Sequence, residues 1–235
     1  PFGQAAPLFG DDAFVVLSSR QSPGLWELEL DLWKPSTDEW KLLSASQFGP
    51  ERVSFDGRHV SWIAFPDDSL AWEKDVYVHD VQTGDTRRIV KDPAWQSFTS
   101  VDQGRVVWED ERGVDINIYL YDLATNTETC VCCEPYDQIS PHISGNLMVW
   151  SDYRFTQTSL NGGKNDLYLY DLDTRVGRRI TFDPGWYGAY PVRQGRLAYV
   201  RLDPTSPAFP YGHEGYVIDL VRAGFLGADG HVVPE

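Results

Sequence analysis

Residues 139–182, ISPHISGNLMVWSDYRFTQTSLNGGKNDLYLYDLDTRVGRRITF, contain four short strand-like segments separated by turn signals. The segments are SPHIS, NLMVWSDYR, NDLYLYDL and GRRITF, and the turns contain Ser-Gly-Asn, Asn-Gly-Gly and Asp-Thr-Arg. β-Branched and aromatic residues favour strands, whereas Gly, Asn and Asp favour tight turns. Similar blocks occur before and after this stretch, so the sequence predicts a repeat of four-stranded units.

An aspartate closes the third predicted strand of every block and gives the length of the repeat. These residues are Asp31, Asp80, Asp122, Asp171 and Asp219. They are 49, 42, 49 and 48 residues apart, close to the ~40–50 residues of one propeller blade. Because each precedes a predicted tight turn, we interpret all five as structural residues that accept backbone N–H groups, not as catalytic residues.

The third strands are apolar on both faces, which favours a propeller over a sandwich. In LYLY, Leu167 and Leu169 point one way, and Tyr168 and Tyr170 the other. A sandwich strand buries one face, whereas a blade lies between two neighbouring blades. We therefore predict an all-β chain: a single five-bladed β-propeller of four-stranded antiparallel blades, forming one domain over 1–235. The blades are predicted at about 7–49, 50–97, 98–138, 139–188 and 189–235.

The fourth strands carry basic residues, which we interpret as charges that protect an outer edge from pairing. These are Arg87, Arg88, Arg178 and Arg179. In the fifth block, the only candidate for this strand is GFLGADGHVV at 224–233. The last strand is expected either from this segment or from N-terminal residues.

Composition and charge restrict the classes of partner. The 235 residues are 42% hydrophobic, which is enough for a core. The net charge of −15 repels nucleic acid and anionic lipid. No apolar run approaches the ~20 residues of a membrane span. The chain begins at Pro1, which suggests that a targeting segment was removed or that the sequence was trimmed.

The cysteines Cys130, Cys132 and Cys133 lie together, and an odd number leaves at least one thiol free or bonded elsewhere. With His142 nearby they could form a metal site, but the paired Cys-x2-Cys spacing of such sites is missing. We predict no metal and no cofactor, and instead strand residues with at most one local disulfide.

The blocks SPHISGNLMVWSDYR…NDLYLYDLDTRVGRRIT and TSVDQGRVVWEDER…NIYLYDLATNTET resemble the repeats of TolB-type β-propellers. In that family a Ser/Pro-rich inner strand, a Gly turn, a VW or AF strand and a DIYLYDL-TG strand recur. The resemblance covers nearly the whole chain. It implies a periplasmic, secreted or cell-surface protein that binds other proteins. Related repeats cap some peptidases and form some polysaccharide lyases.

Variable loops and block-to-block links are predicted to share one face and to carry function. The long loops are 65–75, 154–166 and 203–215, and the links repeat an acid–Pro–aromatic motif: DPAW at 92–95, EPY at 134–136 and DPGW at 183–186. Such aromatics suit sugar stacking or a protein hot spot. Because the motif repeats with the blade, packing between blades is the favoured interpretation. The candidate binding residues are Trp72, Trp95, Tyr136, Arg154, Asn161, Trp186, Tyr187, Tyr211 and His213.

A Trp-x-Asp-x-Arg pattern occurs twice, at 108–112 and 150–154. Strand alternation places Trp, Asp and Arg on one face. We interpret the pattern as an inter-blade ion pair beside a core Trp, in preference to a ligand site.

Sequence signatures of catalysis are missing: the chain has no G-x-S-x-G, no H-E-x-x-H and no phosphate-cradling Gly loop. Glycosidase carboxylates meet only in the folded chain, so the sequence does not decide on them. Asp56 and Asp102 match turn positions. We expect a non-catalytic, extracytoplasmic binding or scaffold protein with a protein partner. The alternative is a carbohydrate-binding lectin or a polysaccharide lyase or hydrolase.

Overall fold

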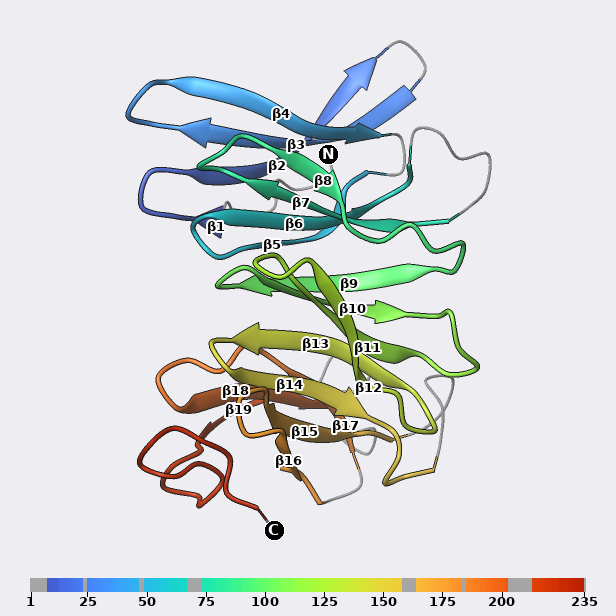
Figure 1. The fold of residues 1–235 in the computed structure, drawn as a ribbon, viewed down its shortest axis with the longest axis vertical. Coiled ribbons are helices and arrows are strands. Elements are labelled where there is room, and N and C mark those ends of the chain that lie inside the picture. The colour runs from blue at the N-terminus through green and yellow to red at the C-terminus, as the bar shows by residue number, and fades with distance from the viewer. Residues whose placement is uncertain are drawn as a thin grey trace. The chain divides into compact units, whose positions relative to one another are not determined.

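The computed structural model describes residues 8–22, 25–46, 49–66, 73–157, 164–182, 185–202 and 213–234. Within these ranges the secondary structure consists of strands and turns, with no helix (Figure 1). The prediction of an all-β chain is therefore confirmed. By its contacts the chain divides into two compact units, 1–112 with 121–128 and 113–120 with 129–235.

The strands form five antiparallel sheets that follow one another along the chain. The first contains β1 (Leu8–Phe9), β2 (Phe14–Ser22), β3 (Leu25–Lys34) and β4 (Glu39–Ser46). The second contains β5 (Glu51–Phe55), β6 (His59–Ala64), β7 (Asp75–Asp80) and β8 (Thr86–Arg88). The third contains β9 (Gln96–Asp102), β10 (Arg105–Asp110), β11 (Asn117–Asp122) and β12 (Thr127–Cys132). The fourth contains β13 (Gln138–Ser144), β14 (Leu147–Asp152), β15 (Asp166–Asp171) and β16 (Val176–Arg179). The fifth contains β17 (Trp186–Ala189), β18 (Arg196–Leu202) and β19 (His213–Asp219).

The fifth sheet differs from the prediction, because it has three strands among the described residues. Its first strand, β17, begins at Trp186, before the predicted start of the fifth block at about 189. The segment 224–233 does not pair with β19. It folds back on itself through a bridge between Leu226 and Val232, and its apolar side chains join the core that the fourth and fifth sheets share.

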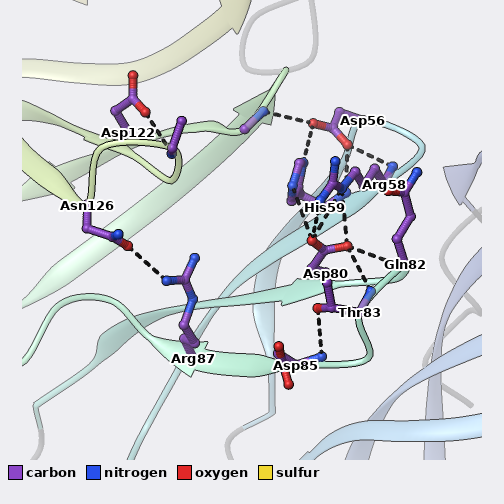
Figure 2. Close-up of polar contacts among 12 residues, drawn as sticks. Asp56, Arg58, His59, Asp80, Gln82, Thr83, Asp85, Arg87, Asp122 and Asn126 are labelled. Atoms are coloured by element: carbon purple, nitrogen blue, oxygen red, sulfur yellow. Dashed lines mark hydrogen bonds and ion pairs between the residues drawn. The ribbon is translucent and has the colours of Figure 1, made fainter.

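Four of the five repeated aspartates cap tight turns, as predicted. Carboxylate oxygens of Asp80 and Asp122 (Figure 2) and of Asp171 accept the backbone N–H of the residue two positions later in the chain at 2.8–2.9 Å. The Asp219 carboxylate accepts the backbone N–H of Arg222 at 3.0 Å. Asp31 is the exception, because β3 continues three residues beyond it to Lys34. Burial and the neighbouring Glu29 raise the pKa of Asp31.

A backbone hydrogen bond recurs next to each of these turns. The residue after the aspartate donates its N–H to a carbonyl of the inner hairpin at 2.8–2.9 Å. The donor and acceptor pairs are Val81 and Arg58, Leu123 and Gly104, Leu172 and Asn146, and Leu220 and Gly195. Gly104 and Gly195 have φ of 74° and 70°, a region that glycine adopts without strain. Each block therefore places one inner-hairpin residue beside its closing aspartate.

Successive sheets pack face to face within each unit. In the first unit β9 contacts β5, β6 and β7, and in the second unit β17 contacts β13, β14 and β15. The second strands of three sheets each bury a tryptophan, Trp62, Trp108 or Trp150. Burial on both faces is the arrangement expected of propeller blades.

Candidate binding site at the end of the fourth sheet

The end of β14 holds a fixed Trp–Asp–Arg group. Asp152 is fully buried and accepts the indole N–H of Trp150 at 2.9 Å. It also accepts Nε and Nη2 of Arg154 at 2.9 and 2.7 Å. The predicted ion pair therefore forms, but within one strand end and not between blades, because the Arg side chain turns back onto its own strand.

A second buried carboxylate lies opposite the first. Asp166 begins β15 and faces Asp152 in the strand register. It pairs with Arg179 of β16 at 2.8 Å and accepts the Thr181 hydroxyl at 3.1 Å. Burial raises the pKa of Asp166, although Arg179 acts in the opposite direction. Two guanidinium groups are thus each positioned by a buried carboxylate at the same end of the sheet.

Aromatic rings lie against these two guanidinium groups. Cζ of Arg154 lies 5.4 Å from the ring centroid of Phe155 and 4.8 Å from that of Tyr168. Cζ of Arg179 lies 4.9 Å from Phe155 and 5.0 Å from Phe182. Phe155 and Phe182 remain 43% and 60% exposed. We call Arg154, Phe155, Arg179 and Phe182 the arginine–phenylalanine cluster.

The third sheet repeats the Trp–Asp–Arg group without making the same surface. Asp110 accepts the Trp108 indole at 2.9 Å and Nη2 of Arg112 at 2.7 Å. Nη1 of Arg112 then binds the carboxylate of Glu128 at 2.7 Å. The guanidinium of the third sheet is therefore shared between carboxylates, whereas those of the fourth sheet also lie against exposed phenylalanines.

Of the predicted binding residues that the structure describes, Arg154 alone belongs to the cluster. Trp72, Asn161 and Tyr211 lie outside the described residues, as does the side chain of His213. Trp186 is half-buried, and Tyr187 is buried beside Asn165, whose side chain bonds both backbone groups of Tyr187 at 2.8 Å. Tyr187 is therefore a packing residue, whereas Trp186 stays partly accessible.

Trp95 and Tyr136 do not pack as wedges, contrary to the favoured interpretation. Trp95 is 45% exposed and has Nζ of Lys74 at 5.3 Å from its ring. Tyr136 is 36% exposed, and its backbone N–H binds Asp115 at 3.1 Å. In both links the tight turn is held by polar contacts, which leave the ring accessible.

The sequence did not single out Phe155, Arg179 or Phe182 as binding residues. The basic fourth strands were interpreted as edge protection, but two of their arginines pair with buried carboxylates, Arg88 with Asp75 and Arg179 with Asp166. Arg178 instead donates to the carbonyl of Gly224 at 2.9 Å. An Asp at the start of a third strand followed by Arg in the fourth is the signal that would have indicated these pairs.

The cysteines form one local disulfide, Cys130–Cys133, and Cys132 is a buried free thiol. The disulfide removes two of the thiolates that a Cys-x-Cys-Cys metal site would need. Burial raises the pKa of Cys132 to about 11, so this thiol stays protonated at neutral pH. In the part of the chain that the structure describes, no helix has the length and apolar character needed to cross a membrane.

Comparison with known proteins identifies the fold. No family model and no curated protein matches the chain. TolB from Acinetobacter baumannii superposes with a TM-score of 0.55 at 14% identity, covering 86% of this chain and 52% of TolB. A prolyl endopeptidase superposes with a TM-score of 0.65 at 19% identity. The superposition covers 99% of this chain and 33% of the endopeptidase. The β-propeller domain of the Pyrococcus furiosus trilobed protease superposes with a TM-score of 0.59 at 12% identity. The superposition covers 78% of this chain and 57% of that domain's chain.

These similarities confirm a TolB-like β-propeller fold, in agreement with the five successive sheets. The chain spans about half the length of the Acinetobacter TolB and a third of the prolyl endopeptidase.

Proposed function

We propose that the chain is a non-catalytic, extracytoplasmic binding module that captures a protein partner through the arginine–phenylalanine cluster. The observation that carries this proposal is the pair of exposed phenylalanines held against two guanidinium groups. Aromatic residues and arginine are typical of binding hot spots. Each guanidinium is also fixed by a buried carboxylate, so little side-chain freedom is lost when a partner binds.

The cysteines support the extracytoplasmic part of the proposal. Disulfides such as Cys130–Cys133 form and persist mainly in oxidising compartments. The role in protein binding follows the expectation from the resemblance of the repeats to TolB-type propellers, whose fold this chain shares.

Affinity capture from the native envelope and secreted fractions tests the proposal. We expect the Phe155→Ser/Phe182→Ser variant to lose the proteins that the wild-type chain retains, because the apolar contact area is removed while the ion pairs beneath it remain. Tyr190→Ser is the matched control, since Tyr190 is another exposed aromatic residue of the same unit. Equal thermal unfolding of the three proteins would show that the fold is retained. Capture of the same proteins by the double variant would refute the proposal.

A second candidate function is suggested by the 99% coverage of this chain by a prolyl endopeptidase. In this alternative the chain is the propeller part of a larger peptidase. Hydrolysis of a blocked proline-containing peptide by the full-length gene product would support it, and no turnover would count against it.

A further inference from the structure

A cavity of about 420 Å³ lies in the first unit, where turns of the second and third sheets meet (Figure 2). Its walls come from the β5–β6, β7–β8, β9–β10 and β11–β12 connections. Its volume is within the usual range for small-molecule sites. It involves none of the residues of the arginine–phenylalanine cluster.

One wall is a hydrogen-bonded network around Asp80. Nε and Nη2 of Arg58 donate to the Asp80 carboxylate at 3.2 and 2.7 Å, and this pairing lowers the pKa of Asp80 to about 2. Nδ1 of His59 lies 3.0 Å from Asp56. Burial alone would raise the pKa of Asp56, but hydrogen bonds from His59 and Arg58 leave it below the ordinary value. The four charged or polar groups of this wall are therefore mutually satisfied.

Two further residues of the lining carry charges that are not satisfied in this way. Asp85 and Arg87 are two residues apart beside and within β8, and both line the cavity. Nη1 of Arg87 donates to the neutral side-chain amide of Asn126 at 2.9 Å (Figure 2). Within the described ranges, no salt bridge joins Arg87 or Asp85 to an opposite charge. The cavity therefore presents one positive and one negative group to a ligand.

The rest of the lining includes the apolar side chains of Val78, Leu123 and Ala124. An apolar surface beside one cation and one anion matches a zwitterion with an aliphatic side chain. A carboxylate alone would meet the like charge of Asp85, and an amine alone would meet the like charge of Arg87. Like-charge contacts of this kind disfavour both single-charge ligands.

We propose that this cavity binds a free α-amino acid with an aliphatic side chain. Arg87 receives the carboxylate, Asp85 receives the ammonium group, and Val78 and Leu123 contact the side chain. Guanidinium groups match carboxylate geometry through paired N–H donors. The Asp80–Arg58 pair joins the β5–β6 turn to the end of β7 and so acts as a positioning group.

Calorimetric titration with L-leucine and its two single-charge analogues tests the ligand class. The analogues are 4-methylpentanoate, which lacks the ammonium group, and 3-methylbutylamine, which lacks the carboxylate. We expect saturable binding of leucine, with each analogue binding about tenfold more weakly or worse, because one charge-assisted contact is lost. Equal binding of all three, or no saturable binding of leucine or alanine, would overturn the proposal.

Two single-residue variants then test which cavity residue binds the carboxylate of leucine and which binds its ammonium group. Arg87→Ala should weaken leucine binding about tenfold and abolish the advantage of leucine over 3-methylbutylamine. Asp85→Asn should abolish the advantage over 4-methylpentanoate instead. Arg222→Ala, at an exposed arginine of the other unit, should leave all three affinities unchanged. If both cavity variants bind leucine as the wild type does, the assignment is wrong. The Phe155→Ser/Phe182→Ser variant should still bind leucine, which separates this test from that of the proposed function.

Discussion

Asp152 is the residue on which the binding surface depends most. Its buried carboxylate accepts the Trp150 indole N–H and two donors of Arg154. Removing it would leave a buried donor and a half-buried charge without their acceptor. The Arg154 guanidinium lies against Phe155 and Tyr168, and the Trp150 indole lies beside Tyr168.

We therefore predict that Asp152→Ala lowers the free energy of unfolding by about 3 kcal/mol, as for other broken buried ion pairs. Urea denaturation of the variant measures this change. Glu134→Ala is the control, because Glu134 is exposed, and it should change stability by less than about 0.5 kcal/mol. Similar stabilities of the two variants would show that the Asp152 group is not energetically important.

Sequence reasoning succeeded for residues whose partners are close along the chain. Asp80, Asp122 and Asp171 cap turns by binding backbone N–H groups two or three positions later in the chain. The Trp-x-Asp-x-Arg group lies within a stretch of five residues. Asp31 was misassigned because strand length depends on pairing, and β3 pairs with β4 as far as Lys34.

At the scale of elements, the C-terminal segment 224–233 is attached to the fourth sheet by polar contacts to Asp171, Asn146 and Arg178. Nδ1 of His231 lies 2.7 Å from Asp171, and the N–H of Val232 binds the same carboxylate at 3.2 Å. Asp171 raises the pKa of His231, and the nearby Asp229 and Asp173 act in the same direction. Burial alone would raise the pKa of Asp171, but hydrogen bonds from Asn146 and His231 lower it to about 2.

These two shifts predict a pH window for the attachment of the segment. The histidine contributes stability that is full below its ordinary pKa of about 6.5 and is lost as pH rises through its raised pKa. The aspartate contributes stability that is full above its ordinary pKa of about 3.9 and is lost as pH falls towards about 2. Attachment should be strongest between about pH 4 and 6.5.

Amide hydrogen exchange of residues 225–233, corrected for intrinsic rates, measures this effect. Protection should fall between pH 6 and pH 9 in the wild type. In His231→Gln protection should be lower at pH 6 and should change little with pH, because glutamine keeps a hydrogen bond but does not titrate. The same pH dependence in both proteins would exclude His231 as its source.

The role of this segment was not predictable from the sequence. Its apolar residues Phe225, Leu226 and Val232 suggested a strand, but they pack against the fourth sheet, and Arg178 holds the backbone at Gly224. Likewise, Arg154 and Arg179, which are 25 residues apart, both lie against the ring of Phe155. Arg58 and Asp80 pair across 22 residues. Such contacts depend on strand register and turn length, which a repeat pattern gives only approximately.

At the scale of the whole molecule, each unit has its own core and its own candidate site. The arginine–phenylalanine cluster lies in the second unit, and the cavity beside Asp80 lies in the first. The two sites share no residue. Changes in one site should therefore leave binding at the other unchanged, as is usual for positions that share no partners.

The most direct test of the account is site-specific photo-crosslinking with p-benzoylphenylalanine in place of Phe155 and, separately, of Trp40. Both side chains are exposed, but Trp40 belongs to the first sheet. The account predicts that irradiation in the native envelope or secreted fraction gives a defined protein adduct from position 155 and none from position 40. No adduct from position 155, or the same adducts from both positions, would contradict the assignment of the fourth sheet's end as the binding surface.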